Sequence, residues 1–220
     1  MTSSKRDWLI PAGLILLSLV PAVAGSARLV QVGNNDPATA RFLETPLPIL
    51  IHIPTAIVYS LLGALQFSPA FRRRNRPWHR AVGKLLLVCG TVVAASGLWM
   101  AHFYAWPAMD GTGVYVERLI VGVAMLYFIY MGIDAIRRRK FNEHGDWMIR
   151  AYALGLGAGT QVLTHIPWFI LQSGVEPQPF DRMIMMGGGW ALNALVAEWI
   201  IRRPKAKVVK QQAAPMLRAA

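Results

Sequence analysis

The sequence predicts an all-α membrane protein built as one polytopic helical bundle. The first observation behind this prediction is composition: of 220 residues, 55% are hydrophobic and only 15% are charged, whereas about a quarter of the residues of a soluble domain are charged. The second is a series of six apolar segments, each long enough to cross about 30 Å of hydrocarbon as a helix of roughly 20 residues. The expected spans are 8–30, 47–67, 81–106, 114–135, 148–171 and 183–201.

These segments cover most of the chain, so we expect residues 1–220 to form a single integral membrane domain with a basic tail over 202–220. The first segment has a second interpretation. Its basic start, its apolar stretch and the small residues at 22–24 are typical of a cleavable signal peptide. We favour an uncleaved helix, since the apolar run continues to Val32. Cleavage would leave five helices and the same orientation for the rest of the chain.

Positive charge is distributed unevenly along the chain. The formal net charge is +12, and 19 of the 23 lysines and arginines lie at the N-terminus, in the regions 68–84 and 136–150, or in the C-terminal tail. The exceptions are Arg28, Arg41, Arg118 and Arg182. Cytoplasmic loops of membrane proteins carry such an excess. We therefore expect a multi-pass protein of the bacterial cytoplasmic (inner) membrane with both termini in the cytoplasm.

The expected partners follow from the same distribution. The apolar segments would contact the lipid bilayer, and the basic loops beside it would attract anionic lipid headgroups at the cytoplasmic face. Nucleic acid is not an expected partner, because the membrane orientation already accounts for the positive charge. A redox partner or a second copy of the chain is a further candidate.

Two loops share one pattern. The stretches "FRRRNRPWHR" (71–80) and "IRRRKFNEHG" (136–145) each contain an apolar residue, three arginines and a histidine five positions after the last of them, His79 and His144. This spacing indicates that the second and third helices and the fourth and fifth helices are copies of one hairpin; the alternative is that two cytoplasmic loops acquired basic residues independently. Glycines on the same helical faces mark sites of close helix approach. We expect the two histidines to approach each other inside the bundle.

The tripeptide His-Ile-Pro occurs twice, at 52–54 and 165–167. The two copies lie in segments that run in opposite directions, so they bring His52 and His165 to one depth, together with His102, roughly 7–12 Å below the outer surface at about 1.5 Å per residue. Polar residues within membrane segments are candidates for function. We expect His52 and His165 to share one interior site, with His102 either a third member or turned toward the lipid headgroups.

Two cofactors could use these histidines. Facing imidazoles at equal depth could hold haem b, and the candidate ligands are His52, His102 and His165 on the outer side and His79 and His144 on the inner side. The three outer histidines could instead bind zinc and leave one position open for water, although no His-x-x-x-His pair supports that site.

A third possibility is a polar path for protons or a small solute. Tyr59 and Gln66 follow the same helical face as His52, and Gln161 lies one turn from His165. Glu198 is a buried proton acceptor on this interpretation, whereas its spacing from Arg202 also predicts a simple i,i+4 ion pair. The alternative for all of these residues is that they are satisfied polar groups that hold helices together.

Several of these motifs resemble a known family. The region from about 47 to 155 contains His52, "HRAVG" at 79–83 and "HGDWMIR" at 144–150, and it resembles the bacterial predicted membrane proteins grouped as domain of unknown function 2306. In that family basic residues usually follow the last histidine, where this chain has Gly145 and Asp146. The resemblance implies the fold and topology and assigns no activity.

The preferred function from the sequence is a membrane redox subunit that binds haem b or a metal through its intramembrane histidines. One alternative is a transporter or channel that uses the His/Tyr/Gln path. Another is a structural or partner-binding membrane protein without a ligand. The chain contains no catalytic motif that assigns a reaction or a substrate.

Overall fold

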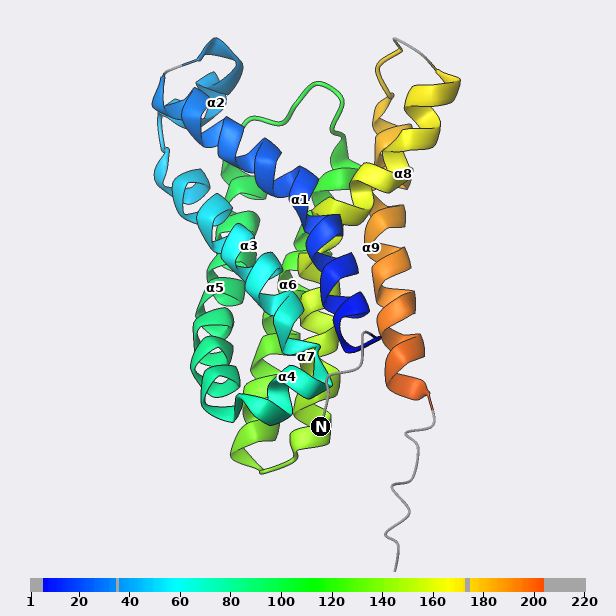
Figure 1. The fold of residues 1–220 in the computed structure, drawn as a ribbon. Coiled ribbons are helices and arrows are strands. Elements are labelled where there is room, and N and C mark those ends of the chain that lie inside the picture. Colours follow the sequence, from blue (N-terminus) through cyan, green and yellow to red (C-terminus); the bar gives the residue numbers. More distant parts are fainter. Residues whose placement is uncertain (1–5, 35, 173–174, 204–220) are drawn as a thin grey trace, which may run out of the picture.

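A computed structural model describes residues 6–34, 36–172 and 175–203, and every regular element within them is helical. The predicted all-α bundle is confirmed (Figure 1). Five helices of the described part are long and apolar enough to cross a membrane. They are α1 (Arg6–Gly33), α3 (Leu47–Gln66), α5 (Arg76–Phe103), α6 (Thr112–Arg137) and α9 (Pro179–Arg202).

The sixth expected span, 148–171, is not one continuous helix, and its crossing of the membrane stays a prediction. It is divided into α7 (Phe141–Gly155) and α8 (Gly157–Leu171), each of 15 residues. The break is at Leu156, between two glycines, and α8 leaves the line of α7 (Figure 1). Neither half alone reaches the roughly 20 residues that a spanning helix needs.

Side chains of α9 hold the break together. The Asn193 amide nitrogen donates to the carbonyl oxygen of Ala153 at 2.9 Å, and the Thr160 hydroxyl donates to the Asn193 amide oxygen at 2.7 Å. The Trp190 ring packs on Gly157 so closely that a Cβ there would overlap it. Backbone groups freed by a helix break inside a membrane must find partners within the protein. The Asn193 amide nitrogen is such a partner for the Ala153 carbonyl oxygen, and the three contacts together hold the break against α9.

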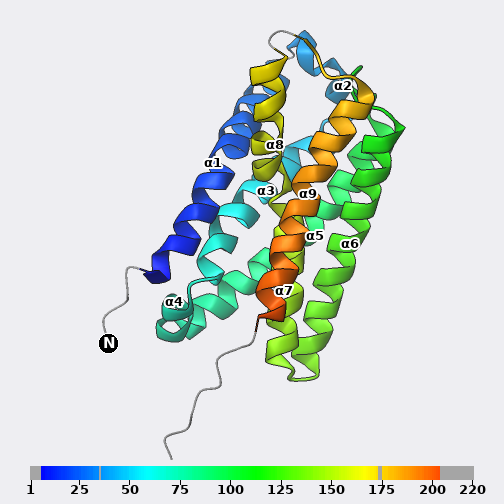
Figure 2. The same cartoon turned by 90° about the vertical axis from the view of Figure 1, so that its right-hand side faces the viewer.

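The bundle has two ends, named here after the short helices α2 and α4 that lie at them (Figures 1 and 2). The α2 end carries the short helix α2 (Ala40–Leu43), the 3-10 turn Pro37–Thr39, the connection 104–111 and the end of α8. The α4 end carries α4 (Pro69–Arg74), the α6–α7 connection, and the ends of α3 and α9. The basic regions expected in the cytoplasm gather at the α4 end as far as they are described, and the four exceptional arginines belong to the α2 half.

Two hydrophobic clusters form the interior. The larger one surrounds Tyr59, Met125 and Tyr152 in the middle of the bundle, and the smaller one surrounds Phe42 and Tyr104 at the α2 end. The most extensive helix contacts are those of α3 with α5 and of α6 with α7. These pairs match the two hairpins of the sequence.

Candidate functional site

The α2 half of the bundle contains a cavity of about 420 Å³ that is lined by residues of all the long helices. Its volume falls in the range of about 300–1,000 Å³ that is usual for small-molecule sites. Most of its wall is apolar or aromatic, including Phe42, Tyr104, Trp106, Met125, Met186 and Trp190. Ala105 and Trp106, at the α2 end, are exposed residues of its wall.

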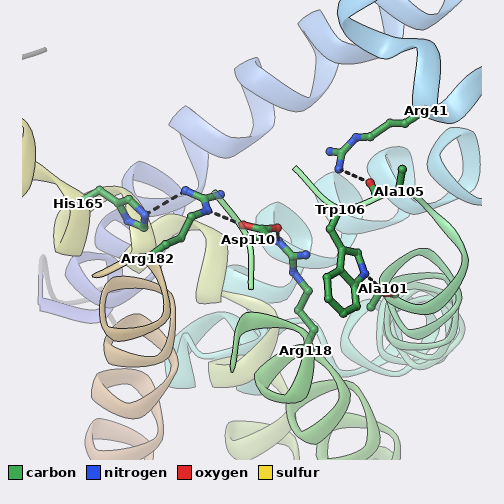
Figure 3. A network of polar contacts seen from close by, with 8 residues as sticks. All are labelled: Arg41, Ala101, Ala105, Trp106, Asp110, Arg118, His165 and Arg182. Atoms are coloured by element: carbon green, nitrogen blue, oxygen red, sulfur yellow. Dashed lines mark hydrogen bonds and ion pairs between the residues drawn. The ribbon is translucent and has the colours of Figure 1, made fainter. Parts of the chain in front are cut away.

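Three arginines from different elements form the rim of this cavity: Arg28 of α1, Arg41 of α2 and Arg118 of α6. Arg41 donates from Nη1 to the carbonyl oxygen of Ala105 at 3.2 Å (Figure 3). Within the described residues, Arg28 and Arg41 form no ion pair with a carboxylate. Partial burial lowers the pKa of Arg41, and the charges of Arg118 and Arg28 lower it further, while Asp110 opposes them. The rim is therefore a group of mutually repelling cations.

Asp110, in the 104–111 connection, holds two arginines together beside the rim. Its side chain is only 1% exposed, and its carboxylate pairs with Arg118 and with Arg182 of α9, each at 2.6 Å. Arg182 also donates from Nη1 to His165 Nε2 at 3.4 Å (Figure 3). Because one carboxylate is shared by two guanidinium groups, the network keeps an excess of positive charge next to the cavity.

His52 of α3 lines the cavity, and its tautomer follows from its neighbours. Its Nδ1 lies 2.9 Å from Ser96 Oγ, and that hydroxyl donates its single hydrogen to the carbonyl oxygen of Val92 at 2.5 Å. Ser96 must therefore accept a hydrogen bond from Nδ1–H of the imidazole. The neutral ring carries its hydrogen on Nδ1, and Nε2 is left as an acceptor.

The other two outer histidines do not line this cavity. His165 Nδ1 donates to the main-chain oxygen of Gln161 at 2.6 Å and so accepts from Arg182 with Nε2. His102 is exposed and lies 3.0 Å from the Tyr115 hydroxyl. The structure thus places the three rings in three separate environments. His165 is connected to the rim arginine Arg118 through Arg182 and Asp110.

The three-histidine zinc site stays a prediction that this arrangement of the rings does not support. Within the ranges 6–34, 36–172 and 175–203, no three side chains of His, Cys, Asp or Glu come together in a way that could hold a metal ion. The physical reason is the helix break. It turns α8 away from the axis of α7, so that His165 meets α9 and the 104–111 connection while His52 faces α5.

The residues of the expected polar path fall on both sides of an aromatic layer. Gln161 lines the cavity and donates from Nε2 to the carbonyl oxygen of Met186 at 3.2 Å. Tyr59 packs its ring against Gly90 and against Gly155, which lines the cavity. The Tyr152 ring lies 5.7 Å from the Tyr59 ring and 4.8 Å from that of Phe67. This layer lies between the cavity and the α4 end, and none of its three rings lines the cavity.

The remaining path residues lie beyond the aromatic layer. Both polar atoms of the Gln66 side chain are buried and have no hydrogen-bond partner within the described residues. Glu198 is an ion-pair partner, since its carboxylate binds Arg150 at 2.5 Å and Arg202 at 3.2 Å. The pair with Arg202 has the i,i+4 spacing noted in the sequence.

His79 and His144 lie at the α4 end, within electrostatic range of each other. His144 Nδ1 donates to the carbonyl oxygen of Gly132 at 2.9 Å. His79 Nδ1 is buried and lacks a hydrogen-bond partner in the described part of the chain. The structure therefore brings the two histidines of the repeated loops into one neighbourhood.

Comparison with known proteins places this geometry in a family. A family model described as "Predicted membrane protein (DUF2306)" matches residues 49–201, which is well over half of the chain. The chain belongs to this family. The match confirms the resemblance seen in the sequence and extends it from α7 to the end of α9. No curated protein and no solved structure matched the chain in these comparisons.

The DUF2306 match includes the deeper part of the cavity and the rim arginine Arg118, but it does not include the rim arginines Arg28 and Arg41. His52, Asp110, Arg118 and Arg182 lie within 49–201, whereas α1 and α2, which carry the other rim arginines, precede the matched region.

Sequence reasoning missed the rim, because the four arginines of the α2 half were treated only as exceptions to the charge bias. The presence of four arginines on the side of the membrane that otherwise has few charges was the signal that could have indicated the rim. Glu117 was missed as well: one of its carboxylate oxygens is buried without a partner in the described residues, and its side chain packs against Gly187 of α9.

Proposed function

We propose that this DUF2306 protein binds an acidic amphiphile in the cavity of the α2 half. The ligand would place an apolar body among the cavity walls and a carboxylate or phosphate at the rim. The observation that carries the proposal is the group of arginines over an apolar cavity. A guanidinium group presents donors in a planar fork that matches carboxylate and phosphate oxygens.

The electrostatics of the rim favour an anionic head. Arg28 and Arg41 lack a carboxylate partner in the described residues, and burial together with neighbouring positive charge lowers the pKa of Arg41. An anion between them would offset both the lost hydration and the mutual repulsion. The apolar body contributes separately, at about 25 cal/mol per Å² of apolar surface removed from water.

Decanoate, a simple acidic amphiphile, provides a direct test. We expect the double variant Arg28→Ala/Arg41→Ala to bind it about tenfold to a hundredfold more weakly than the wild type, because hydrogen bonds to charged groups contribute about 1.5–3 kcal/mol. Native mass spectrometry of the purified protein, released from mild detergent, measures the bound fraction. Arg73→Ala is the matched control, since Arg73 is an exposed arginine at the α4 end. Equal decanoate binding by the double variant and the control contradicts the proposal.

Haem b is a second candidate ligand, favoured by one observation. His52 presents Nε2 as an acceptor while Ser96 fixes Nδ1–H, and a metal-bound histidine commonly has its other nitrogen held in this way. His52 would then be an axial ligand, and the rim arginines would bind the propionates. With haem bound, the protein would serve as a membrane redox subunit for a partner that delivers or accepts electrons. The same purified preparation separates the candidates, because only haem gives a Soret absorption band and the haem mass.

We also propose that the α4 end faces the cytoplasm of a bacterial cell and that the cavity opens to the outside of the cytoplasmic membrane. The support is the concentration of lysine and arginine at the α4 end, where they would meet anionic headgroups of the inner leaflet. A reporter that works only in the cytoplasm should be active after Ala220, and one that works only outside should be active after Ala108. The opposite activities at the two positions would reverse this orientation.

A further inference from the structure

We propose that the ligand of the cavity carries a hydrogen-bond donor, such as a hydroxyl group, on the part that lies between His52 and Gln161. This inference rests on the proposed function and narrows its ligand class. The class is an amphiphilic acid with a second, donating polar group at the end opposite the acid.

The first observation concerns the hydrogen-bond donors and acceptors of the His52 ring. Its one ring hydrogen is used on Ser96, because the Ser96 hydroxyl is itself donating to Val92. The ring also packs beside Gly97 of α5, where a Cβ would lie 3.5 Å from Cε1. The cavity is therefore offered a nitrogen lone pair by His52 and no hydrogen.

Gln161 adds a second acceptor from the opposite wall. Its amide nitrogen donates one of its two hydrogens to the Met186 carbonyl oxygen, so the amide oxygen is left to accept and one N–H is left to donate. Only 9% of this residue is exposed, and it lines the cavity. Two residues from α3 and α8 thus present acceptors to one space.

Two other donors in the wall are already used by main-chain oxygens. The Tyr104 hydroxyl donates to the Thr45 carbonyl oxygen at 2.6 Å, and Trp106 Nε1 donates to the Ala101 carbonyl oxygen at 3.0 Å. Trp190 places its ring nitrogen beside Gly157. The charged donors are concentrated in the arginines at the rim, and the acceptors of His52 and Gln161 lie deeper.

This arrangement discriminates between ligands. A purely alkyl tail would displace water from two acceptors and leave both without a hydrogen bond, which costs binding free energy. A ligand hydroxyl would satisfy one of them. Arg118 and Met125 both line the cavity and are seven residues apart on α6, which corresponds to about 10 Å along the helix. The donor should therefore lie several carbon atoms away from the acid.

Three probes of equal chain length test the inference on the intact protein: decanoate, 10-hydroxydecanoate and 10-methoxydecanoate. The methoxy compound keeps the oxygen and lacks the donor. In competition, measured by native mass spectrometry, we expect the hydroxyl compound to bind about three- to tenfold more tightly than the other two, as for one neutral hydrogen bond. The variant His52→Phe should reduce this preference, and His102→Phe, outside the cavity, should leave it unchanged.

The outcomes separate the inference from the proposed function. Equal binding of the three probes to the wild type, with weaker binding by Arg28→Ala/Arg41→Ala, overturns the inference and leaves the acidic amphiphile in place. A hydroxyl preference that survives equally in His52→Phe and in a Gln161→Leu variant also overturns the inference. Absence of binding for all three probes overturns the proposed function and the inference together.

Discussion

Replacing Asp110 with asparagine should lower the free energy of unfolding by about 3 kcal/mol, which is the lower part of the range of about 3–5 kcal/mol for breaking a buried ion pair. The substitution leaves Arg118 and Arg182 without their shared carboxylate, while their side chains are only 28% and 21% exposed. This partial exposure lets the arginines recover some hydration, so the lower value applies. Unfolding by SDS in mixed micelles, followed by tryptophan fluorescence, measures the change.

Asp134→Asn is the matched control for this experiment. Asp134 pairs with Arg138 at 2.6 Å, but both side chains are more than one-third exposed, and exposed ion pairs contribute about 0–1 kcal/mol. The double variant Asp110→Asn/Arg118→Met should recover part of the lost stability, because it removes one of the two unpaired charges. Equal losses for Asp110→Asn and Asp134→Asn would show that the shared carboxylate does not stabilise the 104–111 connection.

The variant Gly159→Ala should destabilise the protein by about 3 kcal/mol, the upper part of the usual range for overpacking. A Cβ at Gly159 would meet the main-chain oxygen of Leu17 in α1 and lie 3.1 Å from its carbonyl carbon. A side chain could turn away from such a contact, but a backbone carbonyl moves only if the helix moves. The same SDS titration measures the effect.

Gly188→Ala provides the control for the glycine experiment. Gly188 also lies within a helix, and nothing lies within 4 Å of a Cβ built there. Alanine is favoured over glycine in a helix interior by about 1 kcal/mol, so this variant should be neutral or slightly more stable. If Gly159→Ala behaves like Gly188→Ala, then α1 does not pack against α8 as closely as the structure indicates.

The apolar segments made the bundle predictable, because length and composition alone decide whether a helix can span a membrane. The break at Leu156 was not predictable in this way. Glycines on the helical face of His144 predict close packing, and glycine is equally compatible with a continuous helix that packs closely and with a helix that stops. What decides between them is the position of Trp190 and Asn193 on α9, and that contact between distant segments is not visible in local composition.

The candidate site was only partly predictable, because several of its residues are placed by contacts between distant segments. His52 was expected in the interior from its polar helical face, and it lines the cavity. The placement of His165 depends on how α8 turns after the break, so depth along a straight helix could not provide it. Asp110 lies in a connection between helices, and nothing local indicates that arginines of α6 and α9 converge on it.

The aromatic layer formed by Tyr59, Tyr152 and Phe67 also sets where the electric field of the membrane acts. A charge that crosses the whole bilayer gains about 2.3 kcal/mol per 100 mV of potential. If the cavity opens at the α2 end as proposed, with these rings between it and the α4 end, an aqueous cavity would be at nearly the same potential as the medium at the α2 end. The voltage would then fall across the rings and the packed helices beneath them. An anion that reaches the arginine rim would cross almost none of that drop, and its binding would be insensitive to the energised state of the membrane.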